Sequence, residues 1–169
     1  GQLQRISILR SMMLSPAFMV ADEPVSMLDV SVRAEIINML LALVRENNTA
    51  LAFLSHDITL PRYISHRIAV MYLGRIVELG DSDEIIQKPQ HPYTKVLISN
   101  CASIDFECSD TPIDIDGEPP SPINPGPGCY FADRCYMASE RCFTEYPGYR
   151  DLGSGHIAAC HFVDAPVKR

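Results

Sequence analysis

Hydrophobic positions in the first hundred residues recur at two spacings, and these predict an alternation of helices and strands. Apolar residues between 3 and 14 fall near helical spacing, and residues 31–46 carry a stripe typical of an amphipathic helix. The stripe consists of Val32, Ile36, Leu40, Leu43 and Val44, widened by Ile37 and Leu41. Short apolar runs at 17–21 and 50–54 predict buried strands, the first buried on both faces. This helix–strand–helix–strand order predicts parallel pairing in an α/β sheet.

The pattern changes after residue 65. Residues 68–72 and 75–79 flank Gly74 and predict a hairpin of two strands. Residues 82–88 and 92–99 predict two short helices. No apolar run in the sequence approaches the roughly 20 residues that a membrane span needs.

Composition divides the chain into two parts, which we predict to be two domains, residues 1–100 and 101–169. The first part holds 9 Lys and Arg against 10 Asp and Glu, whereas the second holds 5 against 11. All 6 cysteines and 8 of the 13 prolines lie in the second part. Residues 103–127, rich in acidic residues and proline, predict an extended and solvated link. The net charge of −7 argues against a strongly basic nucleic-acid binder.

Polar residues follow the first two predicted strands at the point where each one ends. Asp22 and Glu23 close the first strand, and His56 follows the second. Because ligands bind at the carboxyl edge of open α/β sheets, we expect these three side chains to meet at one edge. Taken singly, each has a plainer explanation: a solvated loop for the carboxylates, a structural contact for the histidine, and a helix N-cap for the nearby Asp29.

Taken together, these residues resemble the second half of an ABC-transporter nucleotide-binding domain, which is an ATPase of the P-loop type. Gly1-Gln2 resembles the end of the five-residue ABC signature, and Met19–Glu23 resembles the Walker B strand. Ser26–Asp29 resembles the D-loop, and His56 the switch histidine. The resemblance covers about residues 1–95. It implies an α/β fold, the C-terminal half of such a domain, followed by a small irregular cysteine-rich extension.

The resemblance also implies a role for each matching residue. Asp22 would hold Mg²⁺, Glu23 would orient or deprotonate the attacking water, and His56 would hydrogen-bond the γ-phosphate of ATP. Gly1 and Gln2 would meet the nucleotide held by a partner subunit, and Asp29 would lie across the dimer interface. Active sites of this family are shared, so a second ATPase subunit, identical or different, is an expected partner.

The sequence contains no G-x-x-x-x-G-K-[ST] phosphate-binding loop. In the family that the chain resembles, this loop belongs upstream of Gly1. We therefore expect the 169 residues to be a C-terminal fragment of a longer enzyme. The fragment alone should not hydrolyse ATP, because phosphoryl transfer depends on the loop and its lysine.

A second set of motifs resembles one branch of the family. Glu78-Leu79-Gly80, His91-Pro92-Tyr93-Thr94 and Glu118-Pro119-Pro120-Ser121-Pro122 resemble the C-terminal extension of oligopeptide, dipeptide and nickel importer ATPases. This branch implies ATP-driven import of peptides or nickel. The protein would lie at the cytoplasmic face of the membrane, with permease subunits and, indirectly, an extracytoplasmic substrate-binding protein as partners, and without nucleic acid. His91 has a plainer explanation as part of a turn and helix start.

Four cysteines of the extension form a pattern that suits a soft metal. Cys129, Cys135, Cys142 and Cys160 are spaced C-x5-C-x6-C-x17-C, without the C-x2-C pair of a zinc ribbon. The family resemblance favours a four-iron four-sulfur cluster, with zinc, and unligated thiols or disulfides, as alternatives. Cys101 and Cys108 fall outside the pattern. His156 and His161 are candidate replacements for one of the cysteines.

Two other classes of function share parts of these features. A soluble, DNA-associated ABC-type ATPase would have the same signature and Walker B strand, but the acidic charge and the importer-like tail disfavour it. A metal- or redox-sensing module built on the cysteine-rich tail would leave the ATPase half vestigial. The intact Asp22, Glu23 and His56 argue against that module.

Overall fold

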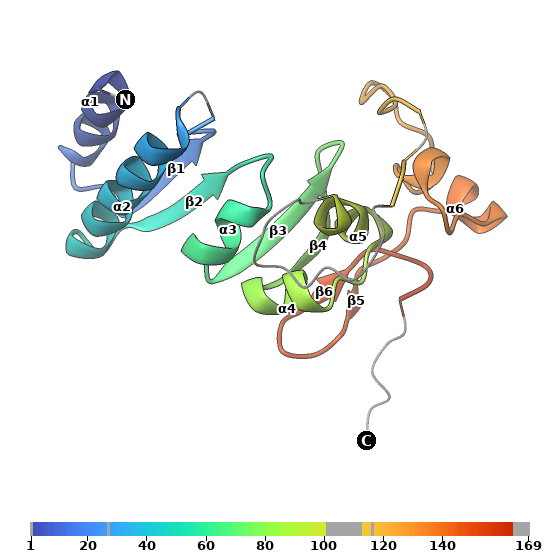
Figure 1. The fold of residues 1–169 in the computed structure, drawn as a ribbon. Coiled ribbons are helices and arrows are strands. Elements are labelled where there is room, and N and C mark those ends of the chain that lie inside the picture. The colour runs from blue at the N-terminus through green and yellow to red at the C-terminus, as the bar shows by residue number, and fades with distance from the viewer. Residues whose placement is uncertain (1, 27, 101–112, 116, 164–169) are drawn as a thin grey trace. The chain divides into compact units, whose positions relative to one another are not determined.

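The structure, a computed structural model, describes residues 2–26, 28–100, 113–115 and 117–163. It divides the chain into two units, Gly1–Ile64 and Ser65–Arg169. Each unit has its own small sheet (Figure 1). The architecture is therefore mixed α/β, with parallel strands in the first unit and antiparallel strands in the second.

The first unit follows the predicted helix–strand order. Its elements are α1 (Gln2–Met12), β1 (Phe18–Asp22), α2 (Val30–Glu46), β2 (Ala50–Leu54) and α3 (Thr59–Ile64). β1 and β2 are parallel and in register from Phe18 opposite Ala50 to Asp22 opposite Leu54. The predicted parallel pairing is confirmed, and it brings the carboxyl ends of both strands to one edge.

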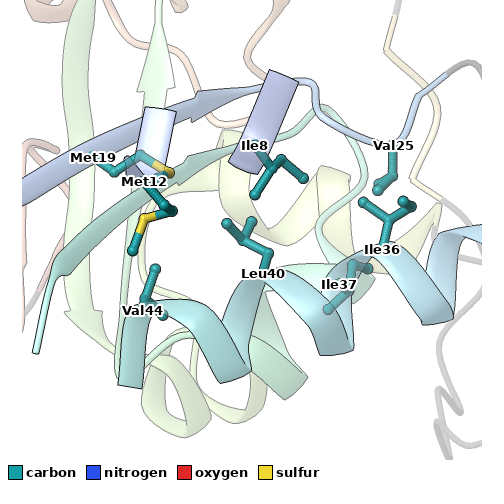
Figure 2. Close-up of a cluster of buried hydrophobic side chains, with 8 residues drawn as sticks. All are labelled: Ile8, Met12, Met19, Val25, Ile36, Ile37, Leu40 and Val44. Carbon is teal, nitrogen blue, oxygen red and sulfur yellow. The ribbon is translucent and has the colours of Figure 1, made fainter. Parts of the chain in front are cut away.

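The core of this unit lies between the two long helices and β1. α2 supplies Ile36, Ile37, Leu40 and Val44, in which Leu40 lies three or four residues from each of the others, as expected for one face of a helix. Figure 2 shows these side chains together with the other members of the cluster, Ile8, Met12, Met19 and Val25. The amphipathic stripe of the sequence is thus the face of α2 that holds the unit together.

β1 differs from the prediction that both of its faces are buried. Met19 is 9% exposed, but Phe18 and Val20 are 59% and 56% exposed. Successive side chains of a strand point to opposite faces, so Met19 packs into the helical core while its two neighbours face away from it. The continuous apolar run of the sequence predicted the strand correctly and its burial incorrectly.

The second unit begins with the predicted hairpin and helices. β3 (Arg67–Tyr72) and β4 (Arg75–Asp81) pair antiparallel, followed by α4 (Ser82–Gln87) and α5 (Pro92–Ser99). The hairpin turn has positive φ at both Leu73 (44°) and Gly74 (77°). Two positive φ values in a two-residue turn match the twist of the flanking strands, which explains the glycine here.

The cysteine-containing tail has little regular structure and joins the same sheet. Its elements are the 3-10 helix η1 (Ala132–Arg134), α6 (Glu140–Thr144), β5 (Arg150–Asp151) and β6 (Ile157–Ala158). β6 pairs antiparallel with β4, so the strand order is β3-β4-β6-β5. The contacts therefore group the tail with residues 65–100, whereas composition placed the domain boundary between residues 100 and 101.

Two further expectations concern the link and the membrane. Within the predicted link, the described residues 113–115 and 117–127 form neither helix nor strand, and most of them are exposed. Among the described residues, no helix is long and apolar enough to cross a membrane.

Candidate functional site

The carboxyl edge of the β1–β2 pair brings Glu23 and His56 into contact. The amide of Glu23 donates to the carbonyl of Leu54 at 3.1 Å, which extends the strand pairing by one residue. Oε1 of Glu23 accepts the backbone N–H of His56 at 2.9 Å and lies 2.7 Å from Nδ1 of the His56 ring. The pair remains open to solvent, with side-chain exposures of 36% for Glu23 and 75% for His56. Of the three residues expected to meet here, Glu23 and His56 do so, whereas among the described contacts none joins the Asp22 side chain to them.

The turn after β1 holds the carboxylate in place. Glu23 has a φ of 45°, in the left-handed region that residues with a side chain seldom occupy. Its carbonyl accepts the backbone N–H and the hydroxyl of Ser26, at 3.4 and 3.1 Å. Such backbone conformations cost free energy and persist where the surroundings enforce them, often at functional sites.

Asp57 has a supporting role that the sequence analysis did not assign. Its Oδ1 accepts the backbone N–H of Thr59 at 2.9 Å and the Thr59 hydroxyl at 2.6 Å. This contact begins α3 directly after His56, and an aspartate two residues before a helix start is the signal that predicts it. The loop that carries His56 is therefore fixed at both ends, by β2 and by Asp57.

The other predicted residues of the nucleotide site lie at element ends. Asp22 is the last residue of β1 and is exposed, and Gln2 is the first residue of α1 and is also exposed. Asp29 occupies the N-cap position of α2, but its side chain makes no capping hydrogen bond. The plainer explanation of Asp29 as the N-cap residue is therefore confirmed for its position, although its side chain does not supply the capping hydrogen bond. Gly1 lies outside the described residues.

A second candidate site is a cavity in the other unit, which the four patterned cysteines line together. Its walls also include two histidines and several apolar residues, and the space between them is small, with about 10 Å³ open to a water-sized sphere. The lining residues are Cys129, Cys135, Cys142, Cys160, His91, His161, Pro92, Phe131, Ala132, Pro147 and Phe162. Cysteines separated by up to 31 positions in the sequence thus face one space.

Local backbone contacts bring these cysteines together. The amide of Cys129 donates to the carbonyl of Cys142 at 2.7 Å, and the amide of Cys135 donates to the carbonyl of Ala132 at 3.2 Å. The amide of Ala159 donates to the carbonyl of Val77 at 2.8 Å, which fixes the segment just before Cys160 against β4. Gly128 permits the first contact, because a Cβ there would lie 2.4 Å from the Cys142 carbonyl oxygen.

Burial affects the pKa of three of these thiols. Burial raises the pKa of Cys135 to about 11, and burial likewise raises the pKa of Cys129 and of Cys160. All four cysteines are free thiols. A bound cation displaces such protons, because the thiolate is the ligand. Within the described ranges, no three His, Cys, Asp or Glu side chains are grouped closely enough to hold a single metal ion.

The two histidines of the cavity wall differ in their contacts. His91 is 1% exposed and is the N-cap of α5, where its Nδ1 accepts the backbone N–H of Tyr93 at 3.1 Å. The explanation of His91 as a helix start is therefore confirmed. Burial, and secondarily the charge of Lys95, lowers the pKa of His91 to about 4, so the ring is neutral at pH 7. His161 donates from Nε2 to the carbonyl of Glu145 at 3.0 Å.

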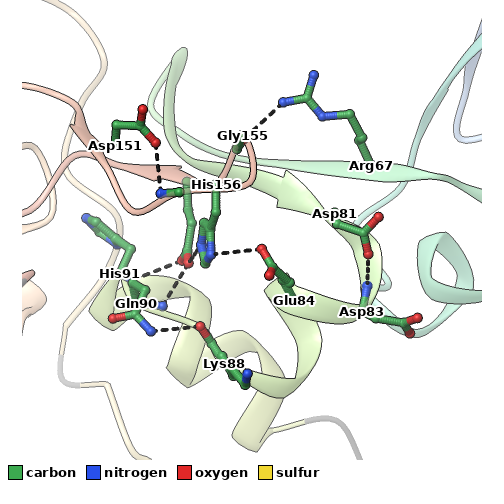
Figure 3. A network of polar contacts seen from close by, with 12 residues as sticks. Arg67, Asp81, Asp83, Glu84, Lys88, Gln90, His91, Asp151, Gly155 and His156 are labelled. Atoms are coloured by element: carbon green, nitrogen blue, oxygen red, sulfur yellow. Dashed lines mark hydrogen bonds and ion pairs between the residues drawn. The ribbon is translucent and has the colours of Figure 1, made fainter. Parts of the chain in front are cut away.

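A buried carboxylate connects β4, α5 and the tail. Glu78 is 0% exposed, and its Oε1 accepts the backbone N–H of Gln90 at 2.7 Å and lies 2.8 Å from Nε2 of His156. Its Oε2 accepts the backbone N–H of His91 at 2.9 Å. Figure 3 shows His156, Gln90 and His91 around this network. Because a buried charge is tolerated only with such partners, His156 is engaged here rather than at the cysteine cavity.

Comparison with known proteins finds one matching family model. Residues 77–142 match the family model described as "Oligopeptide/dipeptide transporter, C-terminal region". The match includes β4 with Glu78, the start of α5 with His91, and three of the four cysteines.

Curated relatives match nearly the whole chain. It is 47% identical over 99% of its length to the probable peptide ABC transporter ATP-binding protein y4tS of Sinorhizobium fredii. It is 44% identical over 97% of its length to the dipeptide transport ATP-binding protein DppF of Haemophilus influenzae. It is also 44% identical, over 95% of its length, to the putative oligopeptide transport ATP-binding protein YkfD of Bacillus subtilis. The chain covers 47–50% of these relatives, about half of their length.

The fold and the Glu23–His56 edge place the chain in a broad class, the C-terminal region of ABC-type ATPases. Within this class, the chain is similar to the ATP-binding proteins of peptide and dipeptide ABC transporters, of which it spans about half.

Proposed function

We propose that the chain is part of an ATP-hydrolysing subunit that powers the import of peptides through an ABC transporter. The observation that carries this proposal is the Glu23–His56 contact at the carboxyl edge of β1 and β2. The names of the relatives, which refer to peptide, dipeptide and oligopeptide transport, supply the substrate class. The subunit would lie at the cytoplasmic face of the membrane. It would act with permease subunits, with a second ATPase subunit and, indirectly, with a substrate-binding protein.

The two side chains divide the chemistry between them. Both contacts from His56 go to Oε1 of Glu23, which leaves Oε2 to accept a proton from the attacking water. Because Nδ1 of His56 faces Glu23, Nε2 is the ring nitrogen left to hydrogen-bond the γ-phosphate. The exposed Asp22 carboxylate would hold Mg²⁺, which neutralises phosphate charge when bound. Three residues would contact the partner subunit: Gly1, Gln2 and Asp29.

The proposal is tested by Glu23→Gln in the complete transporter. We expect the rate of ATP hydrolysis to fall by roughly 10²–10⁴-fold, because the amide cannot take the proton from water. ATP binding should persist, since the shape of the side chain is kept. Glu46→Gln, at the exposed end of α2, is the matched control and should hydrolyse ATP at the normal rate. Hydrolysis at near wild-type rate by Glu23→Gln would contradict the proposal.

Two observations favour transport over the alternatives. The net charge of −7 does not suit a DNA-associated ATPase, and the relatives described above are all named for transport. A sensing module with a vestigial ATPase half would have no reason to keep the Glu23–His56 contact. Since the 169 residues contain no phosphate-binding loop, we propose that they do not hydrolyse ATP by themselves, and they serve as a negative control.

We also propose that Cys129, Cys135, Cys142 and Cys160 bind one iron–sulfur cluster of the four-iron four-sulfur type. Their fit to such a group rests on the donor set, because four soft thiols line one cavity in a loop-rich segment. A bound cluster would link segments of the tail that have little regular structure of their own. Zinc is the alternative occupant of the same four thiols.

The cluster is tested by measuring iron and acid-labile sulfide per chain after anaerobic purification. We expect both in wild type, and a loss of most of both in each of the four Cys→Ser variants. Cys101→Ser and Cys108→Ser are matched controls that should keep the cluster; both residues lie outside the described part of the chain. Stoichiometric zinc without sulfide would contradict the cluster and identify zinc as the bound metal. Retention of iron in Cys142→Ser would show that the proposed ligand set is wrong.

A further inference from the structure

His91 stands out in the wall of the cysteine cavity because it is polar and held rigidly. Its backbone N–H donates to Oε2 of the buried Glu78, and its backbone carbonyl accepts the N–H of Lys95 at 3.1 Å. The ring packs against Phe131, with centroids 5.9 Å apart, and Phe131 is itself 1% exposed. These contacts fix the backbone of His91 and hold its ring against Phe131 in the wall of the cavity.

The contacts of His91 determine which ring nitrogen carries hydrogen. Nδ1 accepts the backbone N–H of Tyr93, so this nitrogen has no hydrogen of its own. A neutral imidazole has one N–H, which must then be on Nε2. His91 therefore offers a hydrogen-bond donor on the ring edge opposite its helix-capping contact.

His161, the other histidine of the wall, does not have this freedom. Its Nε2 faces the carbonyl of Glu145 at 3.0 Å, and a carbonyl only accepts hydrogen bonds. The N–H on Nε2 of His161 is thus already used by this carbonyl. Of the two histidine rings that line the cavity, His91 is the one whose Nε2 hydrogen is not used by a contact among the described residues.

We propose that His91 is a positioning residue that donates a hydrogen bond from Nε2 to a sulfur atom of the group bound by the four cysteines. This inference rests on the proposed iron–sulfur cluster. Hydrogen bonds to the sulfur atoms of a cluster stabilise its more negative, reduced form and so raise its reduction potential. His91 acts in this way through its N–H and is not itself a metal ligand.

The test compares wild type with His91→Asn in anaerobically prepared, full-length protein. Asparagine keeps an acceptor at the N-cap of α5, and the contact with Glu78 uses only the backbone, so the fold is retained. We expect unchanged iron and sulfide per chain. The equilibrium constant for reduction of the cluster should fall at least tenfold, which is a lowering of about 59 mV for a one-electron couple. The potential is read from a redox titration followed by EPR.

A second measurement detects the hydrogen bond itself and does not depend on the potential. In wild type labelled with ¹⁵N-histidine, pulsed EPR of the reduced cluster should show a weak nitrogen coupling, as expected for a hydrogen-bonded ring, and His91→Asn should lack it. His161→Asn, on the same wall, is the matched control and should keep both the coupling and the potential.

The outcomes separate the two proposals. Wild type without iron and sulfide overturns the cluster, and with it the role of His91. A normal cluster whose potential is unchanged in His91→Asn overturns the role of His91 alone. A strong coupling typical of direct ligation, or an equal shift of potential in His161→Asn, also overturns it.

Discussion

At the scale of single residues, the cysteine cavity depends on a position that has no side chain. Gly128 lies against the backbone of Cys142 and Phe143, and the adjacent Cys129 amide bonds the Cys142 carbonyl. The φ of Gly128 is not in the left-handed region, so the need for glycine here is one of space rather than of backbone conformation.

Gly128→Ala should therefore destabilise the tail and loosen the cysteine site. The added Cβ would lie 2.4 Å from a carbonyl oxygen, and the backbone must move to relieve the clash. We expect a loss of about 1–3 kcal/mol in the free energy of unfolding, as for other overpacked sites, together with a lower iron content. Chemical denaturation and iron analysis measure both effects.

Gly126→Ala is the control for this prediction. A Cβ at Gly126 would meet no atom within 4 Å, and its φ is not positive. This variant should match wild type in stability and in iron content. Equal stability of Gly128→Ala and Gly126→Ala would show that the close approach at Gly128 does not matter.

The residues of the candidate site differ in how far the sequence predicts them. Glu23 and His56 could be placed together because each follows a strand of recognisable pattern. Parallel pairing of these strands then brings their carboxyl ends to the same edge of the sheet. The burial of Glu78 could not be predicted, because its partner His156 lies 78 residues further along the chain. The contact of the His91 backbone with the Glu78 carboxylate could not be predicted either, because it depends on how a loop folds back onto β4.

At the scale of elements, segments with an apolar pattern were predictable, and segments without one were not. The helices over 3–14, 31–46, 82–88 and 92–99 and the hairpin around Gly74 agree with α1, α2, α4, α5 and β3–β4, within two residues at most ends. α3 has only six residues and contains Pro61, so it shows no helical stripe. β5 and β6 have two residues each, which is too short for any alternation to be read.

At the scale of the whole molecule, composition and contacts divide the chain at different places. Composition changes near residue 100, where cysteine and proline become frequent. The contacts instead join the tail to residues 65–100, because β6 pairs with β4 and His156 reaches Glu78. Composition reports the character of a segment, whereas a domain is defined by which segments bury one another.

Removal of residues 101–169 distinguishes the two divisions. Without the tail, β4 loses β6, one of its two partner strands, and Glu78 becomes a buried carboxylate with one contact fewer, which costs about 1–3 kcal/mol. We expect amide hydrogen exchange in β3 and β4 to accelerate about tenfold or more, because local opening becomes easier. Exchange in β1, β2 and α2 is the internal control and should not change, since these elements belong to the other unit.

In the intact chain, His156→Ala should reproduce part of the faster exchange in β3 and β4. Unchanged exchange in β3 and β4 after truncation would instead support independent domains that meet at residue 100.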